Sequence, residues 1–312
     1  MRCNRPRIGT MGLGGQSVFL TVDHFHSPGE TLHASSMFIE PGGKAYNQAV
    51  AAARLGAEVV FIGAMGNDEA KEQCCVYLKS ENVTPIIETI VDENTAYACI
   101  LTDNTGENRV SVFRGAAEQL SKNFVSKNEK IIAQCSCMLL SLESPLNATK
   151  TALNLCKKHG VFTILNPAPA IPLEIEFLHS FDLITPNLQE AAFLLGLQNQ
   201  PDTKTLAQHL KHAGFKRAVV TLGENGSLLL DASCAWIFPA LPSKVVDTTG
   251  AGDTFNAALA VFIAEGYSLK EAAIYATNAS SFCVSHANVM DSLPTRNQLL
   301  NVFREIVPIR IL

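Results

Sequence analysis

The chain has 312 residues, of which 47% are apolar and 17% charged, and its net charge at pH 7 is −5. This composition is typical of a packed globular protein, and the length suffices for one large α/β domain. No apolar run approaches the roughly 18 residues that span a bilayer, the N-terminus lacks the apolar stretch of a secretion signal, and no basic tract indicates a nucleic-acid partner, so we expect a cytoplasmic protein that binds neither membrane nor nucleic acid.

The first third of the chain predicts two pairs of short strands around a helix. β-prone segments follow "RIGTMGLGG", and "AYNQAVAAARLG" at 45–56 has the pattern of a helix. A second β-prone stretch at 95–115 contains a hairpin-like turn at 104–108. Strand pairs that interrupt an α/β chain predict a small separate sheet, formed by about 15–40 and 95–115, that acts as a lid.

From about residue 130 onward, predicted strands alternate with predicted helices. The strands are expected at 137–143, 161–169, 182–187 and 217–223, and the helices at 145–160, 188–196, 251–266, 268–284 and 294–306. Such alternation predicts right-handed βαβ units and a three-layer α/β fold, in which helices cover both faces of a mostly parallel sheet. Because no repeat or linker is visible, we expect a single domain over 1–312 that includes the lid.

Nine cysteines are scattered along the chain, and neither Cys74-Cys75 nor Cys135-Ser-Cys137 has the C-x-x-C spacing of a metal or redox site. Several lie in apolar runs, where a cysteine behaves as a small buried hydrophobe. We therefore expect reduced structural thiols, as in a cytoplasmic protein.

Polar residues or glycine follow each predicted strand of the main sheet. They are Glu143, Asn166, Asn187, Gly223 and the segment 247–253. Because ligands of open α/β sheets bind at the carboxyl ends of the strands, these residues are expected to line one rim.

The segment "DTTGAGDTFNAAL" at 247–259 combines a glycine turn with a helix start. The amides of Gly250, Ala251 and Gly252, together with the positive end of the helix, would form an anion site. Asp253 would then be the base that deprotonates a hydroxyl group while those amides hold the phosphoryl group that it attacks, and the helix dipole would keep Asp253 ionised. Alternatively, Asp253 only stabilises the first turn, and the spacing alone does not decide between the two.

A second glycine pair, Gly42-Gly43, precedes a helix with Lys44 and Asn47 one turn apart. The spacing is not that of a Walker A loop. The segment is either a solvated helix start, which this piece alone favours, or a pair of side chains that hydrogen-bond a polyhydroxyl ligand.

Together these segments resemble the PfkB (ribokinase-like) carbohydrate kinases, and most closely the ribokinases among them. "DTTGAGDTFNAAL" is similar to the D-T-x-G-A-G-D motif of the family, and "GGKAYNQAVAAARLGAEVVFIGAMGND" resembles its N-terminal motif. "SPGETL", "LESPL", "LNPAPA", "ITPNLQEA" and "TLGENG" follow in the family's order. The resemblance covers nearly the whole chain and strongly favours the catalytic role of Asp253.

The resemblance implies a role for each segment, with ATP as phosphate donor, Mg²⁺ as cofactor and K⁺ as a stimulating cation. Asp253 would be the base, and the anion hole would be Gly250, Ala251 and Gly252. The residues that match sugar-binding positions are Gly42, Gly43, Lys44, Asn47, Glu143 and Asp253. Those that match nucleotide positions are Asn187, Thr221, Gly223 and Gly226, and Glu190 would hold Mg²⁺ through water. The monovalent-cation loop would comprise Asp247, Thr249, Cys283, His286, Asn288 and Ser292. The lid would form a homodimer contact.

Three departures from the family pattern concern the acceptor pocket and the cation loop. Gly15 and Ser17 stand where ribokinases have the Asn and Asp of an N-x-D element. Losing a charge-assisted hydrogen bond to a sugar hydroxyl costs roughly 1.5–3 kcal/mol, which weakens discrimination for ribose. Tyr46 replaces a small residue and either narrows the pocket, stacks on a ring or faces outward. Asn288 replaces a glycine and is expected to adopt the left-handed region that asparagine tolerates.

The resemblance implies an ATP-dependent kinase for a primary hydroxyl of a small sugar, with ribose as the nearest named acceptor. The altered 12–17 segment leaves another pentose, a hexose or a nucleoside as alternatives. A sugar- or nucleotide-binding regulator without turnover is a further alternative, against which the intact Asp253 motif speaks. A dinucleotide-binding dehydrogenase is disfavoured because no G-x-G-x-x-G with an acidic partner follows the first predicted strand.

Overall fold

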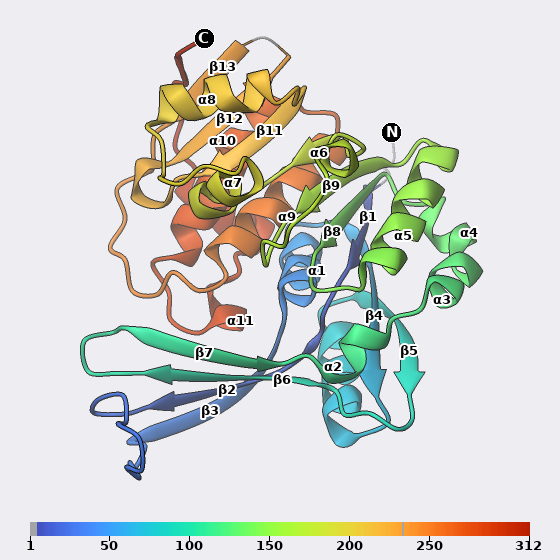
Figure 1. The fold of residues 1–312 in the computed structure, drawn as a ribbon, viewed down its shortest axis with the longest axis vertical. Helices are drawn as coiled ribbons and strands as arrows, with labels where there is room; N and C mark the ends of the chain where they lie inside the picture. The colour runs from blue at the N-terminus through green and yellow to red at the C-terminus, as the bar shows by residue number, and fades with distance from the viewer. Residues whose placement is uncertain (1–4, 233) are drawn as a thin grey trace.

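Two β-sheets of different size organise the chain (Figure 1). The computed structural model describes residues 5–232 and 234–312. The strands of the large sheet, in their order across it, are β14 (Ile309–Arg310), β13 (Cys234–Phe238), β12 (Ser227–Asp231), β11 (Arg217–Thr221), β10 (Leu183–Ile184), β9 (Phe162–Asn166), β8 (Cys137–Ser141), β1 (Arg7–Met11), β4 (Glu58–Gly66) and β5 (Val83–Ile90). The small sheet has the order β3 (Ser36–Gly42), β2 (Gly15–Thr21), β6 (Ala96–Thr102) and β7 (Asn108–Phe113).

The large sheet is parallel from β5 to β11 and antiparallel from β11 to β14. All five residues of β8 are buried, and so are eight of the nine residues of β4, because helices cover both faces of the sheet. Chain connections run outward in opposite directions from β1, which places a topological switch point between β1 and β8.

Helices cover both faces of the large sheet, and a cluster of buried apolar side chains lies under each layer. The helices of one layer are α1 (Lys44–Arg54), α2 (Glu69–Ser80), α9 (Ala251–Ala264), α10 (Leu269–Cys283) and α12 (Arg296–Val302). Those of the other layer are α3 (Lys122–Lys127), α4 (Glu129–Ile132), α5 (Leu146–His159), α6 (Ile175–Leu178), α7 (Leu188–Leu194) and α8 (Thr203–His212). The remaining short helices are α11 (Val289–Ser292), η1 (Gly115–Gln119) and η2 (Gly223–Asn225). The predicted three-layer α/β fold is confirmed.

Helix ends lie where the sequence has capping residues. α5 begins after Pro145 and ends at Gly160, whose φ of 68° is the left-handed conformation of a helix C-terminus. Asn187 is the N-cap of α7 and forms a capping box with Glu190. Because Asn187 lies just beyond β10, this cap fixes a helix N-terminus at the carboxyl edge of the large sheet.

The small sheet extends away from the main body at the lower left of Figure 1. Its antiparallel register pairs Ser17 with Glu40 and Phe19 with Phe38. Residues that are directly opposite share a face of the sheet, so these four side chains lie on one side of it. Ser17, Phe19 and Glu40 line a cleft between the two sheets, so this face of the small sheet covers the carboxyl edge of the large one.

Among the described residues, none of the helices has both the length and the apolar character needed to cross a membrane. The eight cysteines in this part of the chain are free thiols, and five of them are buried. Burial raises the pKa of the Cys74 thiol to about 12, which suits a packing role.

Candidate active site

A cleft of about 700 Å³ lies where the carboxyl ends of the parallel strands face the small sheet. The predicted site residues that line it are Gly42, Gly43, Lys44, Asn47, Glu143, Asn187, Glu190, Thr221, Gly223, Thr249, Gly250, Gly252 and Asp253. A hollow of about 820 Å³ continues from it, shares Thr221, Gly223 and Gly252, and adds Gly226 and Ala251. The structure thus brings together the residues predicted for the acceptor, the phosphate and the nucleotide.

Asp253 lies in the first turn of α9 with only 7% of its surface exposed. Asn47 Nδ2 donates to its Oδ2 at 2.8 Å, and Gln48 Nε2 donates to its Oδ1 at 3.1 Å. Burial raises the pKa of Asp253, whereas the charge of Lys44 and the two amide donors act to lower it. The expectation that the helix dipole keeps Asp253 ionised was therefore incomplete, because it left out desolvation and the side chains of α1.

Gln48 was not among the predicted site residues, although it contacts Asp253 directly. Its Nε2 also donates to Asn166 Oδ1 at 3.2 Å, and Asn166 Nδ2 donates to the carbonyl of Thr185 at 3.1 Å. The chain of amides therefore ties Asp253 to the ends of β9 and β10. Lys44, Asn47 and Gln48 have the i, i+3, i+4 spacing of one helix face, and this spacing could have identified Gln48.

The glycine turn before Asp253 lines the cleft with Gly250 and Gly252. Gly250 caps α9 with a φ of 81°, and a Cβ at this position would lie 2.9 Å from Val289 Cγ1. A Cβ on Gly252 would meet nothing within 4 Å. The first amides of a helix have no acceptor within it, but the Ala251 amide already donates to the carbonyl of Thr248 at 3.3 Å. The turn therefore has the geometry of an anion site beside a carboxylate.

Lys44 and Glu143 form the opposite wall of the site. The Lys44 amide donates to Glu143 Oε2 at 2.9 Å, and Arg114 Nη2 donates to the Glu143 carbonyl at 2.9 Å. Burial raises the pKa of Glu143 to about 7, with Lys44 opposing and Asp253 adding to the shift. Burial lowers the pKa of Lys44, but Asp253 and Glu143 outweigh that effect and the pKa is raised. The charges of Asp253 and Glu143 therefore favour the protonated form of Lys44.

Asn47 offers an unused acceptor. Its side chain is 8% exposed, and its Oδ1 has no hydrogen-bond partner among the described residues. A buried polar atom without a partner is costly, and a ligand hydroxyl would supply the missing donor.

The three positions of the acceptor segment that depart from the family pattern, 15, 17 and 46, have different structural consequences. Ser17 lines the cleft. Gly15 accommodates the neighbouring strand, because a Cβ there would lie 2.1 Å from the carbonyl oxygen of Ala96. Tyr46 neither lines the cleft nor faces outward, which corrects all three alternatives for this residue. It is fully buried, donates its hydroxyl to the Cys74 carbonyl at 2.8 Å and packs edge-on against Phe61.

Asn187 and Glu190 are coupled through the cap of α7. Glu190 Oε2 accepts the Asn187 amide at 2.8 Å, and Asn187 Oδ1 accepts the Glu190 amide at 2.8 Å. Burial raises the pKa of Glu190, opposed by the Asn187 amide. The described residues contain no group of three or more His, Cys, Asp or Glu side chains arranged to hold a metal. One carboxyl group beside a phosphate site still suits Mg²⁺, which binds through few protein ligands and retains water.

Four of the residues predicted for the cation loop come together behind the glycine turn. Asp247 Oδ1 accepts the Thr249 amide at 2.8 Å. Cys283 Sγ lies 3.1 Å from Ser292 Oγ and 3.7 Å from the Thr249 carbonyl oxygen. Carboxylate, carbonyl and hydroxyl oxygens around this point are a donor set that fits a hard cation.

The side chains of His286 and Asn288 make contacts outside this group of four residues. The His286 ring stacks on Phe282 with centroids 4.2 Å apart, and Asn288 Nδ2 donates to Asp291 Oδ2 at 3.1 Å. Asn288 has φ 62° and ψ 140°, so φ is positive but ψ lies outside the expected left-handed helical region. This strained backbone is maintained by contacts from elsewhere in the fold.

Comparisons with known proteins identify the family of the chain. Residues 16–296 match the pfkB family of carbohydrate kinases, so the chain belongs to that family. Ribokinase from Haemophilus influenzae is 36% identical over 299 residues, which are 95% of this chain and 98% of that protein. The bifunctional ribokinase/ribose-5-phosphate isomerase A of Fructilactobacillus sanfranciscensis is 38% identical over 305 residues, which are 96% of this chain and 56% of that longer protein.

Among solved structures, Arabidopsis thaliana ribokinase complexed with ribose and ATP is similar with a TM-score of 0.88 and 28% identity, covering 96% of this chain and 99% of that one. The predicted family and fold are thereby confirmed, and the chain is a carbohydrate kinase of the ribokinase-like fold.

Proposed function

We propose that the protein transfers the γ-phosphate of ATP to a primary hydroxyl of a small sugar, with ribose as the acceptor. The observation that carries the proposal is a buried carboxylate, Asp253, held by two amide donors beside a glycine turn that starts α9 and lines the cleft. The ribokinases among its relatives, one of them a complex with ribose and ATP, support ribose and ATP as the substrates. The whole of 1–312 forms one kinase domain in this proposal, and its small sheet is the lid.

The residues of α1 and β8 would hold the acceptor. Asn47 Oδ1 accepts a sugar hydroxyl, and Lys44 and Glu143 bind further hydroxyls, alongside the backbone of Gly42 and Gly43. Each oxygen of Asp253 accepts one amide hydrogen and keeps a lone pair for a proton.

In the transfer step, Asp253 takes the proton of the acceptor hydroxyl as its oxygen attacks the γ-phosphorus. The bond from that phosphorus to the bridging oxygen breaks, and ADP leaves with the electron pair. The amides of Gly250, Ala251 and Gly252 stabilise the charge on the transferring group. Asn187, Thr221, Gly223 and Gly226 lie along the edge where the nucleotide would bind.

Two cations belong to the proposal. Mg²⁺ would neutralise phosphate charge, with Glu190 orienting its water shell. K⁺ would be held by Asp247, Thr249, Cys283, His286, Asn288 and Ser292, behind the turn that carries the anion site. Ser292 Oγ donates to the Val289 carbonyl at 2.8 Å and lies 3.1 Å from the Cys283 thiol, so one of its lone pairs remains for a cation.

The presence of Ser17 in the cleft favours acceptors other than ribose as alternatives. A hydroxyl stands in the cleft where the resemblance leads us to expect a carboxylate, and a hydroxyl binds sugar less strongly. Another pentose, a hexose or a nucleoside therefore remains the alternative acceptor. A non-catalytic regulator is disfavoured by the intact arrangement around Asp253.

An ADP-release assay over ribose, 2-deoxyribose, other pentoses, hexoses and nucleosides tests the proposal. We expect turnover with ribose, and in Asp253→Asn a loss in kcat of about 10²- to 10⁴-fold, as for removal of a general base. Sugar binding without turnover on any acceptor would support the regulator. An unchanged rate in Asp253→Asn would rule out Asp253 as the base.

The proposal also includes a cytoplasmic protein, without nucleic-acid or membrane partners, that forms a homodimer through the lid. The acidic net charge of −5 and the free thiols of the described part support this view.

A further inference from the structure

The four-residue helix α11 carries part of the cation loop and cannot be stable by itself. It has one internal hydrogen bond of the helical type, from the Ser292 amide to the Asn288 carbonyl at 3.1 Å. Helix nucleation is unfavourable, so a single turn that follows a strained residue needs support from outside. Val289, Met290 and Ser292 are nevertheless buried, each with 5% or less of its surface exposed. The position of α11 is therefore imposed by its neighbours.

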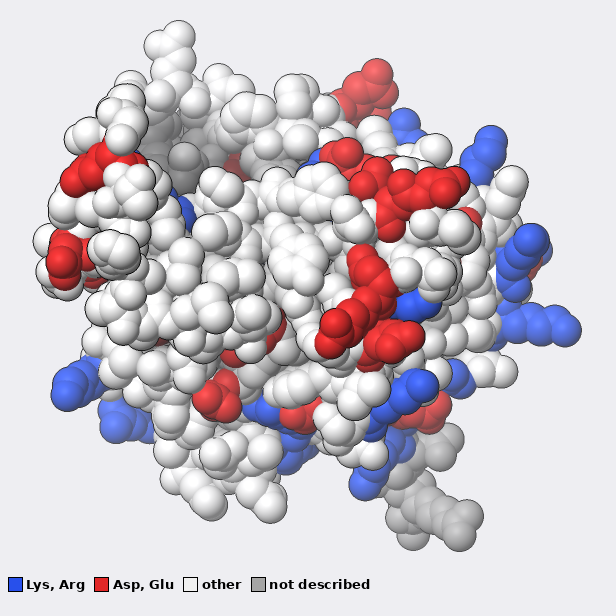
Figure 2. All heavy atoms as spheres, turned by 90° about the horizontal axis from the view of Figure 1, so that it is seen from below, with Lys and Arg blue, Asp and Glu red and all other residues white. Residues whose placement is uncertain are grey.

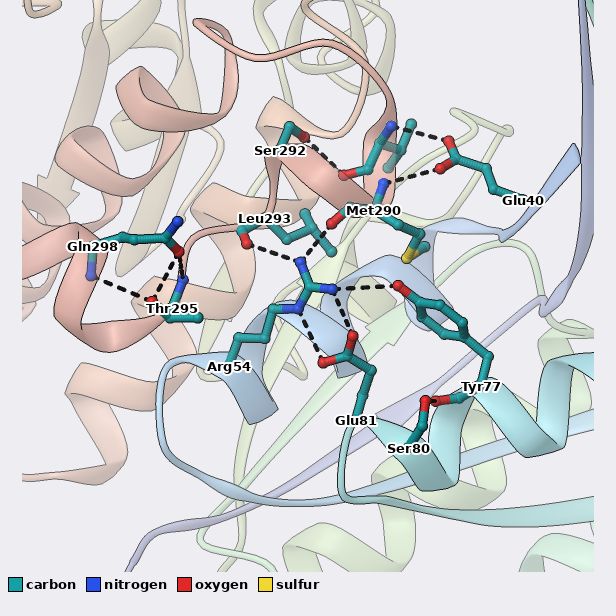
Figure 3. Close-up of polar contacts among 11 residues, drawn as sticks. Glu40, Arg54, Tyr77, Ser80, Glu81, Met290, Ser292, Leu293, Thr295 and Gln298 are labelled. Atoms are coloured by element: carbon teal, nitrogen blue, oxygen red, sulfur yellow. Dashed lines mark hydrogen bonds and ion pairs between the residues drawn. The ribbon is translucent and has the colours of Figure 1, made fainter. Parts of the chain in front are cut away.

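A carboxylate from the small sheet holds the first turn of α11 (Figure 3). Glu40 of β3 accepts the Val289 amide with Oε1 at 2.9 Å and the Met290 amide with Oε2 at 3.2 Å. Both carboxylate oxygens are engaged, each with one of the orphan donors at the helix start. Two residues after Glu40, β3 ends at Gly42, which lines the acceptor end of the cleft. The contact thus ties the base of the small sheet to α11.

A guanidinium group holds the other end of α11. Arg54, the last residue of α1, donates from Nη1 to the carbonyls of Met290 and Leu293, the latter at 3.0 Å. Its Nε donates to Glu81 Oε2 at 3.0 Å, and its Nη2 donates to the Tyr77 hydroxyl at 3.3 Å. Arg54 and Glu81 are only 18% and 20% exposed, so the ion pair is shielded and fixes the guanidinium.

The two charges match the polarity of the helix that they hold. A carboxylate at the first amides and a guanidinium at the last carbonyls both complement the helix dipole. Asn288 and Ser292, two of the residues proposed for the cation, bracket the segment that is held in this way. On the other side, α1 begins with Lys44 and Asn47, which line the acceptor pocket. A connection therefore runs from the acceptor residues to the cation loop.

We propose that Glu40 and Arg54 are positioning residues that clamp α11 between them. The clamp fixes the position of the cation loop relative to the acceptor end of the cleft. The inference rests on the proposed function, because the cation loop belongs to that proposal. The proposal includes no contact of either side chain with the cation or with the reacting atoms. Their effect is carried by the backbone of 288–293.

Glu40→Gln and Arg54→Met test the clamp, with Glu271→Gln as the matched control. Glu271 also accepts a backbone amide at a helix start, that of Ser268 at 2.8 Å, but it caps α10 rather than α11. In both clamp variants we expect the KCl concentration for half-maximal activity to rise about 5- to 10-fold, with a smaller change in the KM for ATP. The control should keep the wild-type KCl dependence.

Two measurements without substrates test the clamp independently of activity. Hydrogen exchange of the amides at 288–293 should become faster in the clamp variants than in wild type and control. The rise in Tm on replacing choline chloride by KCl should shrink in Glu40→Gln and Arg54→Met. Unchanged exchange and an unchanged KCl response in both variants would overturn the inference.

If Arg54→Met does not fold, Glu81→Gln removes the partner of the guanidinium and leaves Arg54 in place, and it is expected to change the same readouts in the same direction. A failure of the cation proposal itself would look different. Wild type would then show no preference for KCl, while accelerated exchange at 288–293 in the variants would still support the clamp.

Discussion

Gln48 is the residue whose role emerged only from the structure. It is fully buried and donates to both Asp253 and Asn166, so it holds the proposed base against the ends of the strands. Its hydrogen bond favours the charged form of Asp253 and lowers the pKa of a carboxyl group that burial raises.

We expect Gln48→Met, which keeps the volume but removes the donor, to raise the pKa of Asp253. A base with a higher pKa loses its charge at a higher pH, so the acid limb of the kcat/KM profile should move to higher pH and kcat should fall about 10-fold. Profiles from pH 5 to 9 for wild type and variant measure the shift. Gln298→Met, which alters the cap of α12, is the control, and an acid limb that stays in place would contradict the role of Gln48.

Glu143 predicts a pH dependence of stability. Its pKa in the folded protein is raised to about 7 from 4.5, so the folded state binds this proton more tightly than the unfolded state. The free energy of unfolding contributed by Glu143 is therefore full below pH 4.5 and is lost as the pH rises to 7. Glu143→Gln stays neutral and should gain stability relative to wild type between pH 5 and pH 8, by at most about 3 kcal/mol.

Urea unfolding of both proteins at pH 5 and pH 8 measures this difference. Glu88→Gln is a control, because Glu88 accepts hydrogen bonds from Ser121 and neither residue lines the cleft. A difference between wild type and Glu143→Gln that does not change with pH would show that Glu143 is not titrating in this range.

At the residue scale, sequence reasoning located the residues whose backbone conformation is unusual or whose spacing is distinctive. The glycine turn before Asp253 is one example, since its two glycines and the start of the helix can be recognised from the sequence. Gln48 and Glu40 were missed because an amide or a carboxylate on an element gives no sign of its distant partner. Tyr46 was misjudged for a related reason, since its direction depends on Cys74 and Phe61, which are far along the chain.

At the scale of elements, the alternation of strands and helices after residue 130 predicted the structure within a few residues. The first third was harder, because β4 and β5 with α2 between them were not recognised as separate elements. β4, with the sequence "EVVFIGAMG", is a nearly continuous apolar run that is buried on both faces, so it lacks the alternation that marks a strand with one solvated face. The register of the small sheet could not be predicted either, because it depends on pairing across many residues.

That register explains why Ser17 differs from the expected aspartate. Ser17 lies directly opposite Glu40, and a carboxylate at 17 would face the carboxylate that holds α11. Burial already raises the pKa of Glu40, so a second negative charge beside it would further disfavour the ionised form of Glu40. Like charges directly opposite on two strands destabilise the pair.

We expect Ser17→Asp to lower the stability by about 0.5–1 kcal/mol at pH 8, and to cost less in a Glu40→Gln background. Thermal unfolding of the two single variants and the double variant gives the coupling between the positions. Ser36→Asp is the matched control, because Ser36 lies on the same face of the same strand pair but opposite Thr21 rather than a carboxylate. Equal costs of Ser17→Asp in both backgrounds would contradict this explanation.

At the scale of the whole molecule, the small sheet exposes apolar side chains on both of its faces. Val110 and Val112 on the side of the cleft are 55% and 54% exposed, and Met37 and Ile39 on the other side are 64% and 51% exposed. Figure 2 shows a stretch of uncharged surface from the left to the centre of the face seen from below, with acidic side chains to the right of it. A bound sugar is small and can cover part of one face, so the remaining apolar surface needs another cover.

We expect that cover to be the small sheet of a second copy, because two apolar sheets pack face to face and a two-fold contact is self-complementary. Wild type should sediment as a dimer at about 10 μM, a concentration well above the Kd of an interface of ordinary size. Ile39→Lys would bury a charge in the contact and should shift the species to monomer, whereas Val307→Lys, at a site 82% exposed outside the small sheet, should leave the dimer intact. A wild-type monomer at every concentration would show that the sheet closes on the sugar within a single chain, and its outer face would then be free surface.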